Sequence, residues 1–256
     1  MPLVTTTAGD LFVMRRGRAG PPLICIHGAG GSARHWGLLL EPLATVAQVY
    51  AVDLPGHGRS PAADGTVTIT RYAQAISALH TALALPPAIV VGHSMGGAIA
   101  LQLAVGAPQI VAGLGLVGSA ARLRVAPALL AGLAGDAAAR QEAINTLAHW
   151  LFSPAADPGL IREAFAEYAA LDPAILLADL QACHGFDIRS QLAAIRSPAL
   201  VVTGADDTLT PPKLGAELAA GLGVEHHLLA NAGHMPMLEA PDLLSELLLR
   251  FISTLA

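Results

Sequence analysis

Three residues of types that together perform nucleophilic catalysis occur along the chain in the order Ser94, Asp207 and His234. Ser94 lies in Gly92-His93-Ser94-Met95-Gly96, a G-x-S-x-G pattern that a strand–turn–helix context turns into a sharp bend with an exposed hydroxyl. A serine hydroxyl is a poor nucleophile until a base takes its proton and an acid orients that base. The pattern therefore predicts acyl transfer through a covalent intermediate on Ser94.

The base and the acid are expected in loops that follow strand-like runs. His234 follows the last such run, where it can reach the serine. Asp206 and Asp207 both follow the run 198–203, and we prefer Asp207 because the spacing Gly204-x-x-Asp207 puts it deeper in the loop. Asp206 is then a solvated neighbour. His93 adjoins the serine, but alternation along its strand is expected to point it away.

A tetrahedral intermediate also needs two backbone N–H donors for its oxyanion. One is expected from Met95, the residue after the nucleophile. The other is expected from Ala29, in the glycine-rich stretch His27-Gly28-Ala29-Gly30-Gly31 that follows an early strand-like run. The predicted oxyanion hole therefore consists of the Ala29 and Met95 amides.

Strand-like and helical runs alternate along most of the chain. This alternation predicts the α/β class, with a mostly parallel central sheet of about eight strands and helices on both faces. The strand-like runs are 11–14, 23–26, 46–52, 88–91, 114–117, 198–203 and 224–229, and the helical runs are 33–43, 69–83, 95–105, 213–220 and 241–255.

The alternation breaks between residues 120 and 195. This Ala-rich segment has a helical pattern that Pro127, Pro154, Pro158 and Pro173 divide into about four short helices. We expect residues 120–195 to form a helical cap over the strand ends, with 1–119 and 196–256 forming the core, because ligands of open α/β sheets bind there. The alternative is a helical subdomain with no role in substrate binding.

Three residues are candidates for the walls of a substrate pocket. His27 precedes the expected oxyanion loop, and Trp150 and Phe152 are large aromatic residues of the expected cap. Both aromatic residues could instead belong to the interior of the cap.

Composition limits the partners to be expected. Of the 256 residues 54% are hydrophobic and 13% charged, with a net charge of −5, which gives no reason to expect nucleic acid or an anionic membrane as a partner. The uncharged stretch 72–121 is broken by Pro86, Pro87 and several glycines, so we do not expect it to span a membrane. The first residues show no basic start and no apolar run, so we expect no export signal and a cytoplasmic protein.

Together these motifs resemble the α/β-hydrolase superfamily, and they are spread over nearly the whole chain. The resemblance implies a carboxylesterase-like serine hydrolase that acts on a small, mainly hydrophobic ester or lactone, without a cofactor or metal. The matching motifs are His27-Gly28, Asp53-Leu54-Pro55-Gly56-His57-Gly58-Arg59-Ser60, Gly92-His93-Ser94-Met95-Gly96-Gly97, Gly204-x-x-Asp207 and Gly233-His234.

Departures from subfamily patterns narrow the chemistry that the resemblance implies. Dehalogenase and epoxide-hydrolase relatives use an aspartate nucleophile, whereas position 94 is serine. Hydroxynitrile lyases typically carry lysine after the catalytic histidine and carbon–carbon hydrolases usually carry tryptophan, whereas this chain has Met235. The group that remains most similar is that of small esterases and enol-lactonases, with carbon–carbon hydrolases and cofactor-free perhydrolases as alternatives on the same triad.

Two hypotheses of other classes compete with a hydrolase. Gly28-Ala29-Gly30-Gly31-Ser32-Ala33 also fits the dinucleotide fingerprint G-x-G-x-x-A, and Asp53 lies about where a ribose-binding acid would follow. A dinucleotide-binding oxidoreductase would leave the order of Ser94, Asp207 and His234 unexplained. A hydrolase-like ligand receptor would keep the fold without turnover, and the complete triad argues against it.

Overall fold

The computed structural model describes residues 3–62 and 65–255. Within them a central sheet of seven strands has the order β3-β5-β4-β6-β7-β8-β9, one strand fewer than the eight predicted. All neighbours are parallel except β3, which runs antiparallel to β5 at the edge. The strands are β3 (Val13–Arg16), β4 (Pro22–Ile26), β5 (Gln48–Val52), β6 (Ala88–His93), β7 (Val111–Val117), β8 (Ala199–Gly204) and β9 (His226–Leu229).

A separate two-stranded sheet precedes the central one. Its strands β1 (Val4–Thr6) and β2 (Gly9–Leu11) pair antiparallel to each other. The predicted first strand, over residues 11–14, is therefore divided between β2 and β3. Both are short, and the residues at their junction are buried.

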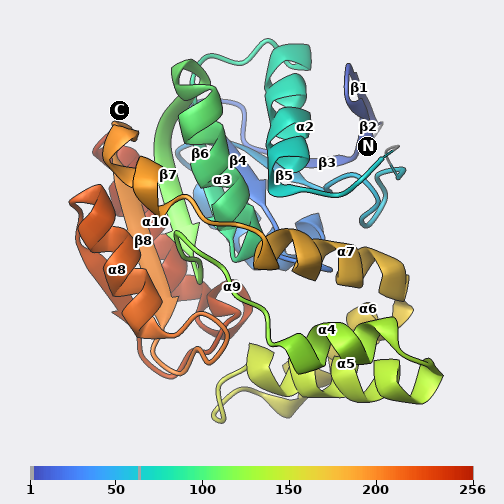
Figure 1. The fold of residues 1–256 in the computed structure, drawn as a ribbon. Helices are drawn as coiled ribbons and strands as arrows, with labels where there is room; N and C mark the ends of the chain where they lie inside the picture. The colour runs from blue at the N-terminus through green and yellow to red at the C-terminus, as the bar shows by residue number, and fades with distance from the viewer. Residues whose placement is uncertain (1–2, 63–64, 256) are drawn as a thin grey trace.

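Helices cover both faces of the central sheet, as the alternation predicted. Ile89 and Val91 of β6 pack in one apolar cluster with α1 (Gly37–Leu43) and α10 (Pro241–Ser253). Val90 packs in the other cluster, because successive side chains of a strand point to opposite faces. That second cluster includes α2 (Ile69–Ala82), α3 (Met95–Gly106) and α8 (Pro212–Leu222), which lie in front of the sheet in Figure 1.

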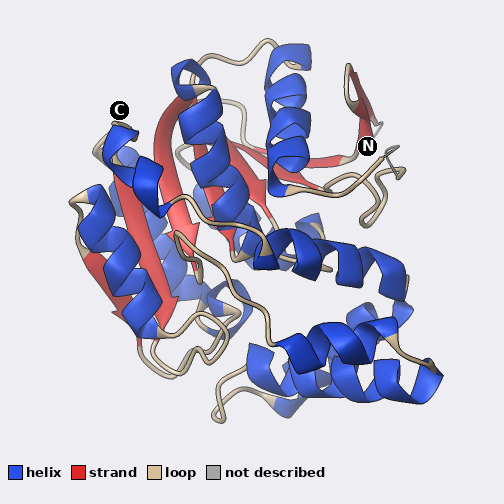
Figure 2. Ribbon diagram, in the orientation of Figure 1, coloured by secondary structure: helices blue, strands red, loops and turns tan. Residues whose placement is uncertain are grey.

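Four helices between β7 and β8 form what we call the helical insertion, as the prolines predicted. They are α4 (Pro127–Ala134), α5 (Ala137–Leu151), α6 (Pro158–Ala170) and α7 (Pro173–His184). A proline begins α4, α6 and α7, where its missing N–H costs no helical hydrogen bond. Figure 2 shows the insertion beyond the end of the sheet to which the arrowheads point. The shorter helices are η1 (Ala33–Trp36), η2 (Pro108–Ile110), η3 (Arg189–Ala194) and α9 (Pro236–Glu239).

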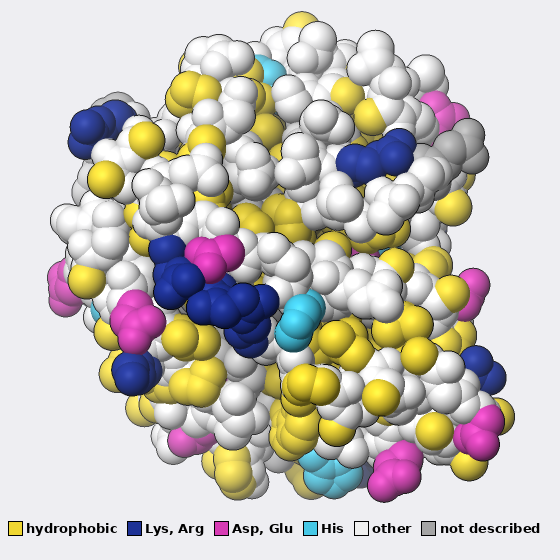
Figure 3. Space-filling model, in the orientation of Figure 1, with side chains coloured by type: hydrophobic (Ala, Val, Ile, Leu, Met, Phe, Trp, Pro, Cys, Tyr) yellow, Lys and Arg dark blue, Asp and Glu magenta, His cyan; other side chains and the backbone are white. Residues whose placement is uncertain are grey.

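The surface is unevenly charged. In the view of Figure 3, hydrophobic side chains are spread over the helical insertion, whereas Lys and Arg side chains gather to its left with acidic side chains beside them. Over residues 3–62 and 65–255, no helix combines the length and the apolar character that crossing a membrane requires.

Candidate active site

Ser94 occupies a strained turn between β6 and α3. Its backbone has φ of 52° and ψ of −114°, a conformation that costs a non-glycine residue about 1–3 kcal/mol. Both backbone polar groups of Ser94 are hydrogen-bonded. Its amide donates to the Val117 carbonyl at 2.9 Å, and its carbonyl accepts from the Ser119 hydroxyl at 2.8 Å. The serine therefore stands at the carboxyl end of the sheet, as predicted.

The glycines on either side of the turn are required by close backbone approach. A Cβ atom on Gly92 would lie 2.1 Å from the Gly96 carbonyl oxygen, and one on Gly96 would lie 2.3 Å from that of Ile26. Both distances are far below van der Waals contact with atoms that cannot move away. The G-x-S-x-G spacing thus follows from the packing of β6, α3 and β4.

An acid–base pair lies in the two loops that the sequence indicated. His234 Nδ1 donates to Asp207 Oδ2 at 2.8 Å, and both side chains are buried. The other Asp207 oxygen, Oδ1, accepts from the backbone amides of Leu209 and Thr210 at 2.9 and 2.8 Å. Burial raises the pKa of Asp207, but the charge and hydrogen bond of His234 and the bonds from Thr210 outweigh it, so the pKa is lowered. The acid is therefore ionised and fixed.

Asp206 points elsewhere. Its side chain is exposed, and its Oδ2 accepts from the Ser153 hydroxyl at 2.7 Å. Of the two aspartates it is Asp207, the preferred candidate, that the structure brings to His234.

Ser94 and His234 line one cavity of about 320 Å³. Ala29 and Trp150, two further predicted site residues, also line it. The remaining walls are mostly aliphatic side chains of the helical insertion and of neighbouring loops. They comprise Leu123, Arg124, Val125, Ala126, Leu129, Leu147, Leu180, Cys183, Thr208, Leu209, Thr210 and Leu214.

Two predicted pocket residues lie outside this set. His27 is fully buried beneath its loop: Nδ1 donates to the Gly28 carbonyl at 2.7 Å, and Nε2 accepts from the Leu54 amide at 3.1 Å. Phe152 is buried in an apolar cluster that includes Leu147 and Leu151 of α5. His27 was a candidate because it precedes the oxyanion loop, and Phe152 because it is a large aromatic residue of the expected cap. Neither lines the cavity: hydrogen bonds hold His27, and apolar packing buries Phe152.

The two predicted oxyanion donors are the backbone amides of Ala29 and Met95. Within the described part of the chain, neither the Ala29 nor the Met95 amide donates to another protein atom. The preceding carbonyl, of Gly28, accepts from the Gly31 amide at 3.1 Å and from His27, which fixes the peptide to which the Ala29 amide belongs. Met95 is the first residue of α3, where backbone N–H groups have no helical partner.

His93 does not point away from the site, contrary to the expectation from alternation. Its Nε2 donates to the His234 carbonyl at 2.7 Å, and the two imidazole rings lie 4.8 Å apart. Burial, above all, lowers the pKa of His93 well below its usual value. Because β6 ends at His93, the side chain extends past the sheet and reaches the loop that carries His234. A neutral His93 thus holds the backbone of His234 through this hydrogen bond.

Glu239 is a residue that sequence reasoning missed. Its carboxylate accepts from the amides of Gly233 and Met235, each at 3.0 Å, and from the amide of Ser153 at 2.7 Å. It therefore holds the residues on both sides of His234 and joins them to the end of α5.

Comparisons with known proteins identify the family of the chain. The profile of the alpha/beta hydrolase family matches residues 23–247, which is most of the chain. The chain belongs to the alpha/beta hydrolase family. The fold is shared with the crystal structure of an enol-lactonase from Burkholderia xenovorans, with a TM-score of 0.89 and 23% sequence identity over 98% of this chain and 100% of that one.

Relatives of this alpha/beta hydrolase carry several activities. It is 33% identical to a pimeloyl-[acyl-carrier protein] methyl ester esterase of Neisseria meningitidis over 240 residues, 89% of this chain and 91% of that protein. It is 34% identical to the dihydrolipoyllysine-residue acetyltransferase component of an acetoin cleaving system of Pseudomonas putida over 92% of this chain. The match spans 64% of that longer relative. These findings identify a hydrolase of the family but not its substrate.

The structure gives Asp53 of this hydrolase a role other than ribose binding. Its Oδ1 accepts from the Ala33 amide at 2.6 Å, and its Oδ2 accepts from the Arg59 amide at 2.8 Å. A Cβ atom on Gly58 would lie 2.3 Å from Oδ2, so the loop closes tightly on the carboxylate. The acid of the apparent dinucleotide fingerprint thus joins two loops of the hydrolase fold.

A second buried acid–base pair in the hydrolase joins the core to the helical insertion. His57 Nε2 donates to Asp179 Oδ2 at 2.8 Å, and His57 Nδ1 donates to the Pro55 carbonyl at 3.1 Å. With both ring nitrogens donating, His57 is an imidazolium. Burial lowers its pKa, but the hydrogen bond and charge of Asp179 outweigh burial, so the pKa is raised.

This pair should make stability depend on pH. Because the folded state binds the His57 proton more tightly than the unfolded state, the stabilisation is complete below about pH 6.5 and is lost as the pH rises through the raised pKa. We expect the difference in unfolding free energy between the wild type and His57→Gln to shrink as the pH is raised, measured by urea unfolding. Taking the difference cancels the opposite contribution of His93, whose pKa is lowered by burial and by groups other than His57. A difference that stays constant or grows with pH would contradict the assignment.

Proposed function

We propose that this alpha/beta hydrolase is a serine esterase that cleaves a small, mainly hydrophobic carboxylic ester or lactone. The observation that carries the proposal is the ionised Asp207 bonded to His234, which shares an apolar cavity with Ser94 on its strained turn. The 33% identity to a methyl ester esterase over nine-tenths of the chain supports the same reaction class.

In the first half of the reaction, Ser94 Oγ attacks the substrate carbonyl carbon while His234 Nε2 takes the hydroxyl proton. Asp207 holds Nδ1–H, which leaves Nε2 free to accept that proton, and its charge stabilises the imidazolium that forms. The electron pair of the C=O bond moves to oxygen, and the amides of Ala29 and Met95 donate to this oxyanion.

The intermediate then collapses to an acyl-enzyme. His234 returns the proton to the leaving alkoxide, and the ester bond to the alcohol breaks. Water next attacks the acyl carbon with His234 again as base, which releases the acid and restores the Ser94 hydroxyl. No redox step or external cofactor is needed for this sequence.

The cavity walls favour an apolar substrate of limited size. Its volume of about 320 Å³ lies near the lower end of the range of ligand pockets, about 300–1,000 Å³. Leu129 and Leu147 of α4 and α5 and Leu180 and Cys183 of α7 line it, so the helical insertion supplies much of the wall. We therefore propose that residues 120–195 form the predicted cap over the active site, with Trp150 at its edge.

An activity screen tests the proposal. With p-nitrophenyl esters of increasing acyl length, we expect kcat/KM to rise while added methylenes enter the cavity and to fall once it is full. Lactones and the corresponding anilides should be run in parallel, with Ser94→Ala as the blank. A pre-steady-state burst followed by steady turnover is expected for an enzyme. Release of one equivalent without further turnover would indicate a receptor, and no hydrolysis of any ester or lactone would contradict the proposal.

A further inference from the structure

One peptide bond of the expected oxyanion loop is held at both of its polar atoms by the helical insertion. The Ala29 carbonyl accepts from the Tyr168 hydroxyl of α6 at 3.2 Å, and the Gly30 amide donates to Asp179 Oδ2 of α7 at 2.9 Å. The two atoms belong to the same planar peptide group. The orientation of the peptide that follows Ala29 is therefore set by side chains of the insertion and not by the core.

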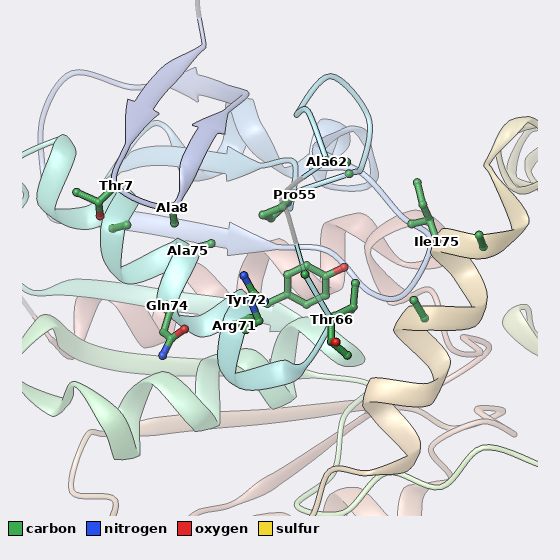
Figure 4. Close-up of a pocket in the computed structure, with 16 residues that line it drawn as sticks. Thr7, Ala8, Pro55, Ala62, Thr66, Arg71, Tyr72, Gln74, Ala75 and Ile175 are labelled. Carbon is green, nitrogen blue, oxygen red and sulfur yellow. The ribbon is translucent and has the colours of Figure 1, made fainter.

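Asp179 is itself held in place from the core. Its side chain is fully buried, Oδ2 accepts from His57 Nε2 at 2.8 Å, and Oδ1 accepts from the Tyr72 hydroxyl at 2.7 Å. In Figure 4 the ring of Tyr72 projects from α2 with its hydroxyl directed toward α7, across a second cavity of about 520 Å³. Together with the Gly30 amide, the His57 ring and the Tyr72 hydroxyl make three donors from three core segments to this one carboxylate of the insertion.

The insertion also packs directly on the loop backbone. Gly30 has φ of +65°, and a Cβ atom there would lie 2.9 Å from both Leu176 Cδ1 and Tyr168 Cε1. Only glycine suits both the conformation and the space. The loop thus fits closely beneath α6 and α7.

We propose that Asp179 is a positioning residue for hydrolysis, which holds the Gly30 amide so that the neighbouring Ala29 amide faces the oxyanion. This inference rests on the proposed function, since it needs an ester whose carbonyl is attacked by Ser94. Asp179 is not among the residues that line the catalytic cavity, whereas Leu180 and Cys183 of the same helix are. It acts through the loop and not on the substrate.

The test separates positioning from simple loss of stability. For Asp179→Ala we expect kcat on a p-nitrophenyl ester to fall about 100-fold, the effect of losing one oxyanion donor, with KM changed less than about threefold. A trifluoromethyl ketone, whose carbonyl Ser94 converts to a hemiketal oxyanion, should bind less tightly by a similar factor. Asp179→Asn keeps an oxygen that can accept from Gly30 and should recover most of the lost kcat.

Two variants serve as controls. Tyr72→Phe removes one donor that holds Asp179 but leaves its contacts with His57 and Gly30, so kcat should fall much less than in Asp179→Ala even where the melting temperature falls. Tyr168→Phe removes the second contact to the same peptide without leaving a buried charge unpaired. It should lower kcat in the same direction, which keeps the proposal testable where Asp179→Ala does not fold.

Several results would overturn the inference. These are an unchanged kcat in Asp179→Ala, an unchanged affinity for the ketone, or an Asp179→Asn variant as slow as the alanine variant. Failure of the proposed function is distinct, because in that case the wild type itself would turn over no ester and the inference would fall with it.

Discussion

Replacing Ser94 with alanine should lower kcat for ester hydrolysis by about 10⁴- to 10⁶-fold while leaving the fold intact. Removing the hydroxyl removes the atom that forms the acyl-enzyme, and the residual rate comes from the oxyanion donors and binding alone. The hydrogen bonds with Val117 and Ser119 use the backbone amide and carbonyl of residue 94, so they are expected to remain in the alanine variant. Steady-state kinetics on the best ester of the screen, with circular dichroism as a check on folding, measures the effect.

Covalent labelling provides an independent readout for the same variant. A fluorophosphonate should add one phosphonyl group to the wild type in intact mass spectrometry and none to Ser94→Ala. Ser119→Ala removes the hydrogen bond to the Ser94 carbonyl but keeps the Ser94 hydroxyl, so it should still take up one phosphonyl group, even where labelling is slower. Labelling of Ser94→Ala at the wild-type rate, or retained hydrolysis, would show that another residue is the nucleophile.

Replacing Asp207 with asparagine should lower kcat by about 10⁴-fold. The Leu209 and Thr210 amides both donate to Oδ1, so the single oxygen of asparagine must occupy that position. The NH₂ group then faces His234 Nδ1, which can pair with it only as an unprotonated acceptor. The proton moves to Nε2, and a protonated Nε2 cannot take the hydroxyl proton of Ser94.

Asp206→Asn is the matched control for that prediction. It lies next in the chain, is exposed, and bonds to Ser153 rather than to the base, so we expect a change of about twofold or less. The comparison measures kcat of the two variants at the same pH, together with their melting temperatures. A larger loss in Asp206→Asn than in Asp207→Asn would reassign the acid.

Much of the site could be predicted because its determinants are local in sequence. Glycines at fixed spacing around Ser94 define a turn that few backbones other than a strand–turn–helix can form. Asp207 and His234 each follow a run that the sequence marks as a strand, and parallel strands bring their following loops to one edge. The choice of Asp207 over Asp206 also rested on a local feature, its distance from Gly204.

The parts that escaped prediction depend on contacts between distant segments. Asp179 meets His57 from 122 residues away and Gly30 from 149 residues away, and no local pattern encodes either pairing. Its one sequence signal is a lone acid within an otherwise apolar helical run, which is equally typical of a solvated helix face. The prediction that His93 points away from the site was wrong for a related reason. Alternation indicates the side of a strand on which a residue lies, but not what its side chain meets beyond the end of the strand.

The backbone of Ser94 has a consequence for how this protein can vary. At φ of +52° the backbone favours glycine, so we expect replacement of Ser94, the proposed nucleophile, with glycine to relieve strain at the turn. A substitution at position 94 that favours folding alone would therefore remove the hydroxyl that the proposed reaction needs. A serine at this position therefore fits the proposed chemistry better than it fits the backbone, and the hydrogen bonds with Val117 and Ser119 stabilise its strained turn.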